Sequence, residues 1–394
     1  MGRDFTKITP LDAAWLAAPS ARAVCDAVAS GGHRILFVGG CVRNALLGMP
    51  VVDVDLATSA LPQQVMELAQ AAGLTPVPTG IDHGTITVVS DGIPYEVTTF
   101  RRDVQTDGRH AVVAFSDRIE DDARRRDFTM NAIYADREGT IIDPLCGMGD
   151  LEVRHVRFIE NAEQRIREDY LRTLRYFRFH AWYGDPDGGL DPEALAAIAA
   201  NLSGLETLSA ERIGAEMAKL LSAPDPAMAL AGMAQAGVLG TILPGADIRF
   251  VLPMIHSADR AGIAPDWLGR LVALGGMGVP ERLRLSRADQ RRYAAIHTAA
   301  FGTKGLLETA FDHGAALAAQ AYLIQCAIAE TSPDPAYVAV LKAAAAQVFP
   351  VAASDLMPQL TGADLGARLA QLKAAWIASG FTLDRQQLLA LPMP

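Results

Sequence analysis

The chain has 394 residues, of which 50% are hydrophobic and 20% are charged, and its formal net charge is -10 at pH 7. This composition excludes a disordered chain and predicts two or three domains at about 150 residues per domain. The negative charge argues against binding nucleic acid through overall charge, so any such contact must come from a local basic patch.

The four cysteines show neither a disulfide framework nor the spacing of metal ligands, and they predict a reducing compartment, the cytoplasm. The N-terminus has no visible secretory signal. The longest apolar stretch, 315–329, is interrupted by two glutamines and is too short to span a bilayer. We therefore expect a cytoplasmic protein without a membrane segment.

The predicted elements change in character along the chain. Residues 1 to about 30 predict an Ala-rich helix, and 61–72 predict another. Short apolar or alternating runs predict strands at 35–38, 51–56, 84–90, 93–100, 111–115, 134–136 and 141–143. After Gly149 the strand signals largely stop, and helical spacing begins at Leu171 and continues to the C-terminus. Asp191-Pro192 predicts a helix start with an N-cap and a first-turn proline.

This order predicts an α+β fold, in which a head with a small mixed or antiparallel sheet is followed by helices alone. We expect the head at 1–150, a helical neck at 151–250, and a helical body and tail at 251–394.

The strongest motif begins at Val38-Gly39-Gly40 and ends at Asp53-Val54-Asp55. Paired glycines between a strand and a helix let the backbone approach a ligand, and the N–H groups of the helix start favour a phosphate. Arg43 adds a cation one turn into that helix. If Asp53 and Asp55 lie two apart on one strand, both carboxylates share a face, where they could hold divalent cations. A dinucleotide-binding turn is the alternative, but no third glycine follows at the required offset.

The stretch 36–58 resembles the signature of the class II tRNA nucleotidyltransferases, which include CCA-adding enzymes and bacterial poly(A) polymerases of the DNA polymerase β superfamily. This resemblance implies that Asp53 and Asp55 are catalytic and hold Mg²⁺. It also implies that Gly40 and Arg43, with Gly39 in the same turn, bind the nucleotide.

Further segments resemble the family in the same order. Tyr95-Glu96-Val97 resembles the strand beside the metal site, which makes Glu96 a possible third metal ligand. Asp107-Gly108-Arg109 resembles a flexible loop that helps the change from adding C to adding A. Within 124–132, the resemblance implies that Arg126 touches the triphosphate and that Asp127 and Asn131 support the junction of head and neck. Leu208-Ser209-Ala210 resembles a helix-capping segment, and Ser209 is also an ordinary N-cap candidate.

The segment 154–180 contains seven arginines and four acidic residues, so it is locally basic. On a helix, Asp169 and Arg172 are neighbours at i,i+3, and a salt-bridged helix is the simplest interpretation. In the family this segment selects the base. Cytosine and adenine both place an amine beside a ring nitrogen acceptor, which suits a carboxylate and a guanidinium, whereas uracil and guanine reverse that edge. The resemblance gives this role to Asp169 and Arg172, with Arg175 and Arg178 on the base or the phosphates.

The sequence therefore predicts a template-independent enzyme that adds CCA to tRNA from CTP and ATP, with Mg²⁺ as cofactor, and no obligate protein partner. Poly(A) polymerase, partial CC or A addition, and a non-catalytic RNA-binding module are the alternatives. Two departures from the family are visible. Asn44 replaces the aspartate that commonly follows Arg43, and the histidines of a phosphohydrolase domain are missing. Phosphate contacts with tRNA are predicted for Arg260, Arg270, Arg282, Arg284, Arg287, Arg291 and Arg292, although a solvated helical face explains these residues equally well.

Overall fold

The protein is described from a computed structural model that covers residues 10–107 and 110–393, with the backbone alone for 103–107 and 110–113. The chain divides into two compact units. One comprises Met1–Glu216 and Met228–Ile242, and the other comprises Met217–Ala227 and Leu243–Pro394. The predicted division into three domains at residues 150 and 250 stays a prediction. Asp107-Gly108-Arg109 lies outside the residues whose side chains are described.

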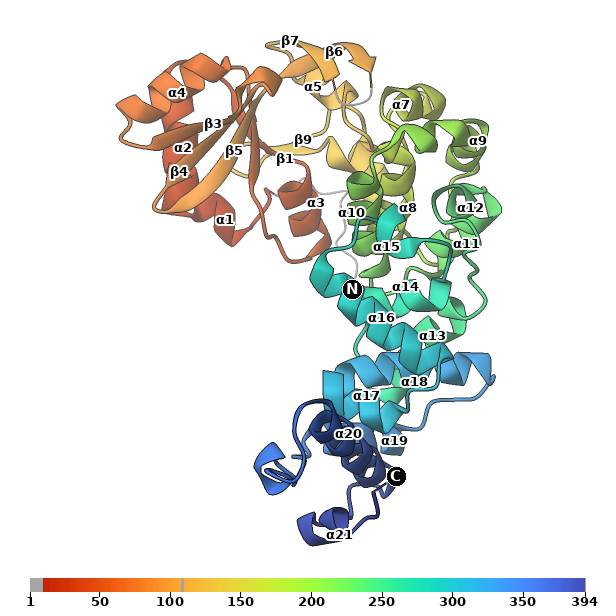
Figure 1. The fold of residues 1–394 in the computed structure, drawn as a ribbon. Coiled ribbons are helices and arrows are strands. Elements are labelled where there is room, and N and C mark those ends of the chain that lie inside the picture. Colours follow the sequence, from red (N-terminus) through yellow and green to blue (C-terminus); the bar gives the residue numbers. More distant parts are fainter. Residues whose placement is uncertain (1–9, 108–109, 394) are drawn as a thin grey trace. The chain divides into compact units, whose positions relative to one another are not determined.

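The first unit is built on a mixed sheet with the strand order β3-β4-β5-β2-β1-β8-β9 (Figure 1). Strands β2 and β5 run parallel, and the other neighbours run antiparallel. Strands β6 and β7 form a separate two-stranded sheet. The bounds are β1 Ile35–Val38, β2 Asp55–Thr58, β3 Thr75–Gly80, β4 Thr85–Ser90, β5 Ile93–Thr99, β6 Arg101–Asp107, β7 His110–Phe115, β8 Tyr134–Ala135 and β9 Ile141–Ile142. The small mixed sheet and the α+β class are confirmed.

One face of this sheet is covered and apolar. Leu56 and Val97 are paired across β2 and β5 and are buried. Helices α2 (Pro19–Ser30) and α4 (Pro62–Ala71) pack against the sheet (Figure 1), and the Ser20 hydroxyl of α2 lies 2.7 Å from the Tyr95 hydroxyl of β5. Because side chains alternate along a strand, the residues next to Leu56 and Val97 point to the opposite face.

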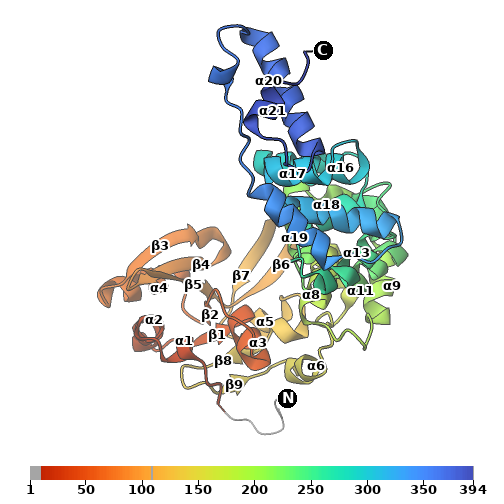
Figure 2. The same ribbon diagram turned by 90° about the horizontal axis from the view of Figure 1, so that it is seen from below.

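The other helices of the first unit follow the sheet or connect its strands. Figure 2 shows α3 beside β1, the strand that leads into it. Their bounds are α1 Ala14–Ala17, α3 Gly40–Leu47, α5 Ile119–Arg124, α6 Gly147–Glu152, α7 Ala162–Glu168, α8 Leu171–Tyr183, α9 Pro192–Ala200, α10 Ala210–Leu221, α11 Ala227–Gln235 and α12 Val238–Ile242. Helix α10 belongs to this unit up to Glu216, and its last residues, from Met217, belong to the second unit, as does Ala227 at the start of α11. Short 3₁₀ helices lie at Ile81–His83, Thr129–Asn131 and Leu202–Thr207. The helix start at Asp191 is confirmed, since its side chain accepts a hydrogen bond of 2.9 Å from Glu193 N.

Several predicted helices and strands differ from the structure, and strand β6 was not predicted. The N-terminal helix is two helices, because Pro19 begins α2 and the residue before it is extended. The strand predicted at 51–56 begins only at Asp55, and Val52 is 88% exposed in the preceding loop. Strand β3 was missed because its two prolines argue against a strand. Among the described strands it pairs with β4 alone, so it is an edge strand, where proline is tolerated.

The second unit is helical throughout its described residues. Its central helix α18 is largely apolar and packs against α13, α14, α16, α17 and α19, while Trp376 of α20 anchors a C-terminal apolar cluster. The bounds are α13 Val251–Ala258, α14 Trp267–Leu274, α15 Val279–Arg282, α16 Arg287–Phe301, α17 Leu306–His313, α18 Ala315–Ile328, α19 Pro335–Ala345, α20 Gly362–Ala378 and α21 Arg385–Leu389, with 3₁₀ turns at Asp259–Ala261 and Ala353–Asp355. Among the helices that the structure describes, none combines the length and the apolarity needed to cross a membrane.

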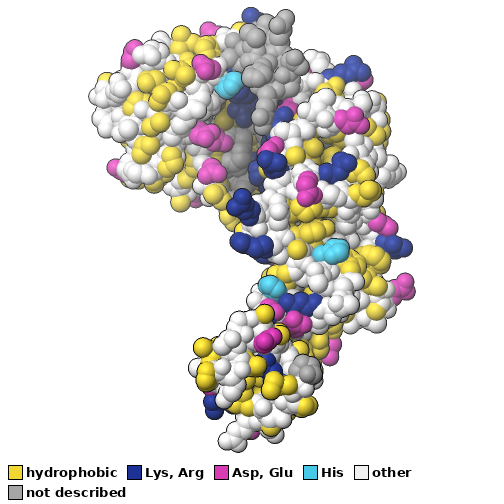
Figure 3. All heavy atoms as spheres, viewed as in Figure 1, with side chains coloured by type: hydrophobic (Ala, Val, Ile, Leu, Met, Phe, Trp, Pro, Cys, Tyr) yellow, Lys and Arg dark blue, Asp and Glu magenta, His cyan; other side chains and the backbone are white. Residues whose placement is uncertain are grey.

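The predicted phosphate contacts in this unit include one error. Arg270 is 3% exposed, and its guanidinium donates to the carbonyls of Leu221, Ala223 and Pro224 at 2.5–3.0 Å. It therefore caps the carboxyl end of α10 instead of facing solvent. On the face shown in Figure 3, the lysine and arginine side chains stand in separate small groups among acidic and apolar ones. On this face the basic surface is thus local, in keeping with the acidic composition.

Candidate active site

The glycine turn lies between β1 and α3. Gly39 has φ +73° and ψ -122°, a conformation that side chains other than hydrogen rarely allow, and Gly40 begins the helix. A Cβ atom at position 39 would also lie 3.4 Å from Arg126 Nη1. The glycine at this position thus permits the turn and leaves room for the arginine. The predicted turn from strand to helix is confirmed.

Two of the acidic residues, Asp55 and Glu96, lie on the face of the sheet opposite to Leu56 and Val97. Asp55 is the first residue of β2 and is paired in register with Glu96 of β5, so both carboxylates point to the same side. Asp53 is exposed in the loop before β2, so the prediction that both aspartates alternate on one strand was wrong. The pKa of Asp55 is raised by burial and by the negative charges of Glu96 and Asp53, while Arg126 opposes the shift. These four charged groups therefore act on one another.

The donor chemistry of this cluster fits a divalent cation. Carboxylate oxygens are the ligands that Mg²⁺ prefers, and a cation would relieve the repulsion that raises the pKa of Asp55. In the part of the chain that the structure describes, no group of three His, Cys, Asp or Glu residues is close enough to hold a metal ion. The geometry thus gives no support to Glu96 as a third ligand. A cation held by Asp53 and Asp55 therefore needs oxygen donors besides these two carboxylates.

Arg126 is held by an acid that the sequence analysis did not single out. Its Nε and Nη2 donate to Asp122 Oδ2 at 3.2 and 3.0 Å, and Arg125 donates to Asp122 Oδ1 at 2.8 and 2.6 Å. Burial alone would raise the pKa of Asp122, but Arg126 and Arg125 outweigh it and bring the pKa to about 2. The signal in the sequence is an acid three and four residues before two arginines, at the end of a short helix.

Arg43 is 6% exposed, and all three of its guanidinium nitrogens have partners. Nε and Nη2 donate to Asn44 Oδ1 at 3.2 and 2.9 Å, Nη1 donates to Asn131 Oδ1 at 2.5 Å, and Nη2 donates to the Tyr183 hydroxyl at 2.8 Å. The guanidinium carbon also lies 3.9 Å from the centre of the Tyr183 ring. Burial lowers the pKa of Arg43, and its hydrogen-bond partners are all uncharged. The cation is therefore fixed but not neutralised by these partners.

A chain of hydrogen bonds continues from Arg43 to α8. Asn131 Nδ2 donates to Asp127 Oδ1 at 2.8 Å, and Arg175 Nε donates to Asp127 Oδ2 at 2.7 Å. Burial opposes the charge on Asp127, but Arg175 and the Asn131 amide hold its pKa well below the ordinary value. Asp127 and Asn131 thus connect Arg43 of α3 with Arg175 of α8, and their role at a junction of head and neck stays a prediction.

Asp169 and Arg172 do not lie on one helix as predicted. Helix α7 ends at Glu168, Asp169 is extended, and α8 begins at Leu171. The side chain of Asp169 accepts from Arg212 Nη2 with both oxygens, at 3.0 and 2.7 Å, and Arg172 Nη1 donates to Glu168 at 2.7 Å. The two remain neighbours because Arg172 N donates to Asp169 O at 2.9 Å. Arg212 and Glu168 are the partners that sequence spacing did not identify.

Three cations surround one buried ring of α8. The guanidinium carbons of Arg43, Arg175 and Arg178 lie 5.1, 5.3 and 4.6 Å from the centre of the Phe179 ring. Arg178 Nε donates to Glu216 at 2.5 Å. Ring faces attract cations, so Phe179 helps three like charges to share one region. The Ser209 hydroxyl is buried and has no hydrogen-bond partner among the residues that the structure describes, so its predicted N-cap bond is not formed.

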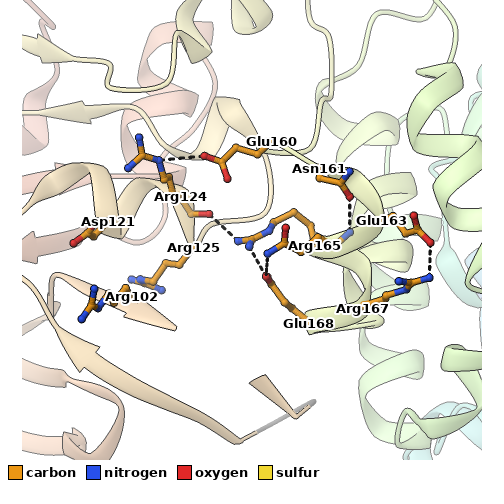
Figure 4. Close-up of a pocket in the computed structure, with 11 residues that line it drawn as sticks. Arg102, Asp121, Arg124, Arg125, Glu160, Asn161, Glu163, Arg165, Arg167 and Glu168 are labelled. Carbon is orange, nitrogen blue, oxygen red and sulfur yellow. Dashed lines mark hydrogen bonds and ion pairs between the residues drawn. The ribbon is translucent and has the colours of Figure 1, made fainter. Parts of the chain in front are cut away.

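A polar cavity of about 780 Å³ lies beside Arg125 and Glu168 (Figure 4). Most of its arginines are paired with acids of the rim, as Figure 4 shows for Arg124 with Glu160 and Arg167 with Glu163. It is lined by Arg102, Asp121, Arg124, Arg125, Glu160, Asn161, Glu163, Gln164, Arg165, Arg167 and Glu168. None of the predicted site residues lines it, although Arg125 and Glu168 are the direct partners of Asp122 and Arg172.

Two family descriptions match the chain. Residues 35–157 match a poly(A) polymerase head domain, and residues 189–249 match a probable RNA- and SrmB-binding site of polymerase A. The mitochondrial CCA tRNA nucleotidyltransferase 1 of Mus musculus is 32% identical over 387 residues, which is 94% of this chain and 88% of the relative.

Two bacterial enzymes agree with this match. A CCA-adding enzyme of Geobacillus thermodenitrificans is 45% identical over 216 residues, 54% of this chain and 52% of the relative. The solved structure of a Bacillus stearothermophilus CCA-adding enzyme with CTP has a TM-score of 0.74 and 30% identity, and the match covers 91% of this chain and 92% of that one. The chain therefore belongs to the family of CCA tRNA nucleotidyltransferases, as its motifs predict.

Proposed function

We propose that this protein is an enzyme that adds CCA to the 3′ end of tRNA without a nucleic-acid template, using CTP and ATP and releasing pyrophosphate. The observation that carries the proposal is the gathering of Gly39, Arg126 and Asp55 in a chain that aligns over 94% of its length with a CCA tRNA nucleotidyltransferase. Its partners are tRNA, CTP and ATP, and its place is the cytoplasm, in keeping with its free cysteines.

Asp53 and Asp55 are the proposed catalytic residues, and Mg²⁺ is the proposed ion. When bound, the ion lowers the pKa of the attacking RNA hydroxyl and neutralises the charge of the triphosphate. The exposed Asp53, in the loop before β2, and the half-buried Asp55, at the start of β2, supply two carboxylate groups as oxygen donors. Phosphate oxygens of the nucleotide suit the remaining positions, because Mg²⁺ is commonly held by one or two carboxylates together with substrate phosphates.

The triphosphate is proposed to lie at the glycine turn. Backbone N–H groups at Gly40 and the start of α3 face it, and Arg126 Nη1 lies beside Gly39. Arg43 contributes charge from beneath the turn, since its guanidinium is buried and already bonded to Asn44, Asn131 and Tyr183. A fixed cation of this kind stabilises developing negative charge without reorganising during the reaction.

Base selection is proposed for Asp169 and Arg172, with Arg175 and Arg178 next to them on α8. Each carboxylate oxygen can accept two hydrogen bonds, so Asp169 Oδ2 can accept from an exocyclic amine while it is still held by Arg212. Arg172 uses Nη1 and Nη2 for its protein partners, which leaves its Nε as a donor to a ring nitrogen. Uracil and guanine would place a carbonyl opposite the carboxylate of Asp169 and an N–H group opposite Arg172. Each group left without a hydrogen bond would cost about 1–3 kcal/mol of binding free energy.

One alternative within the family is favoured by a specific observation. The match of 189–249 to a binding site of polymerase A suits poly(A) synthesis, and partial CC or A addition uses the same head. A non-catalytic RNA-binding module is a different class of function, and it is disfavoured because a module that only binds RNA has no need of Asp53 and Asp55 at the turn.

The test is to incubate the protein with Mg²⁺ and tRNA trimmed of its terminal CCA, supplying CTP and ATP separately and together, and to size the products. We expect two added residues with CTP alone and three with both nucleotides. Long adenosine tails with ATP would identify a poly(A) polymerase, and unchanged RNA in every lane would contradict catalysis.

A further inference from the structure

Asp122 is a buried charge that the proposed chemistry does not use. Its side chain is completely buried, and it accepts hydrogen bonds from Arg125, Arg126 and the Tyr134 hydroxyl, the last at 2.7 Å. Burying a carboxylate costs free energy unless it is paired and fully hydrogen-bonded. The role of a buried charge such as Asp122 is therefore to be sought in the groups that it binds.

The carboxylate is divided between two guanidinium groups. Oδ1 takes Nε and Nη2 of Arg125, and Oδ2 takes Nε and Nη2 of Arg126. Planar two-point contacts of this kind fix the orientation of an arginine as well as its position. The nitrogen of Arg126 that does not donate to Asp122 is Nη1, and it is the atom beside Gly39.

The position of Asp122 is itself fixed to the strand that leads into the turn. Ile119 and Ala123, on the same helix α5, pack in one apolar cluster with Leu36 and Val38 of β1. Tyr134 belongs to β8, which pairs directly with β1. Asp122 therefore connects Arg126 to β1, the strand that also positions Gly39. The arginine and the glycine turn of the proposed triphosphate site are thus held by the same strand.

We propose that Asp122 is a positioning residue of the nucleotide site, which holds Arg126 so that its Nη1 edge faces the glycine turn and binds the triphosphate of CTP or ATP. Asp122 acts through Arg126 and does not touch the nucleotide. This inference rests on the proposed function, because it assigns the triphosphate to the turn. It adds a residue outside the predicted site, and it makes the ion pair part of substrate binding as well as of stability.

The test compares Asp122→Asn with wild type in the full-length protein, with calorimetric CTP affinity and steady-state CTP incorporation measured in parallel. The amide removes the charge and turns one acceptor into a donor, so Arg126 loses its fixed orientation. We expect the Kd and the KM for CTP to rise about tenfold or more, inhibition by inorganic triphosphate to weaken by a similar factor, and the KM for tRNA to stay within about twofold.

A double-mutant cycle separates positioning from general stability. If Asp122 acts through Arg126, then Asp122→Asn should weaken CTP binding by no more than about twofold in an Arg126→Ala background. Asp121→Asn is the matched control, because Asp121 lies on the same helix and its carboxylate contacts Ser116 instead of an arginine. It should leave CTP affinity unchanged.

Two results would overturn the proposal: unchanged CTP affinity in folded Asp122→Asn, or additive effects in the cycle. If Asp122→Asn does not fold, Asp122→Glu carries the same expectations, because it keeps the charge but moves the carboxylate away from the Arg126 fork. A wild type that binds CTP but incorporates none would count against CCA addition, while the binding measurements would still decide the role of Asp122.

Discussion

Replacing Asp55 by asparagine should abolish catalysis without destabilising the protein. The carboxylate begins β2 directly opposite Glu96, near Asp53, and its raised pKa shows that the ionised form is disfavoured in the absence of a cation. Asparagine keeps the size of the side chain and removes the repelling charge. A residue retained only for folding would give the opposite result, because its removal would cost stability.

The expected gain in stability follows from the pairing of the strands. Like charges directly opposite on neighbouring strands destabilise a sheet by about 0.2–1 kcal/mol. For a unit of this size, about 1 kcal/mol corresponds to a shift of about 2–4 °C in Tm. We therefore expect Asp55→Asn to melt up to about 3 °C above wild type in EDTA.

The assay is thermal unfolding of both proteins in EDTA and in Mg²⁺, together with CTP incorporation into trimmed tRNA. A ligand that binds the folded state alone raises Tm, so Mg²⁺ should stabilise wild type and should have a much smaller effect on the variant. Glu96→Gln separates repulsion from metal binding. It should raise Tm in EDTA by a similar amount but keep activity if Glu96 is not a ligand. The reasoning would be refuted if the Asp55→Asn protein still incorporated CTP, or if its Tm were several degrees below that of wild type.

Three further changes test the neighbouring groups. Mg²⁺ binding should weaken on the acid side at a higher pH than an ordinary aspartate predicts, because burial and nearby acids raise the pKa of Asp55 in the metal-free protein; the Mg²⁺ affinity measured across this pH range checks this. Arg172→Ala should relax selection against UTP and GTP by about tenfold each while RNA binding persists, as competition assays would show. The lowered pKa of Asp122 makes its charge worth about 2 kcal/mol above pH 4, a contribution lost as the pH falls towards 2, so Asp122→Asn should flatten acid unfolding between these values.

The glycine turn could be predicted because it depends on local sequence. A short apolar run followed by two glycines specifies a strand, a tight turn and a helix over a few residues, and Gly39 adopts the positive φ that the turn requires. The prediction that Asp53 and Asp55 lie on one strand was correct for Asp55 and wrong for Asp53, which precedes β2. Period-two alternation identifies a shared face within a strand, but it does not say at which residue the strand begins.

The pairing of charges could not be predicted from spacing. Helical neighbours suggested Asp169 with Arg172, whereas the structure pairs Asp169 with Arg212, 43 residues away, and Arg175 with Asp127, 48 residues away. Several arginines and acids with similar local spacing allow many combinations, and only the packing of α8 against the rest of the unit selects among them. Arg270 is a second example of a contact that sequence spacing does not predict. It belongs to a basic stretch of the sequence, but its side chain is buried and caps the end of a helix.

The buried acids explain how an acidic protein can offer a site to a polyanion. A free surface arginine loses about 2 kcal/mol of side-chain entropy when a ligand orders it. In this unit that ordering is already complete before the nucleotide arrives, since Asp122 holds Arg126 and Asp127 holds Arg175, each by a two-point contact. Asp122 also balances two arginines with one charge, and the partners of Arg43 are neutral, so positive charge remains after the pairing. The acids thus serve to fix the cations more than to neutralise them, which is what preorganised stabilisation of a triphosphate requires.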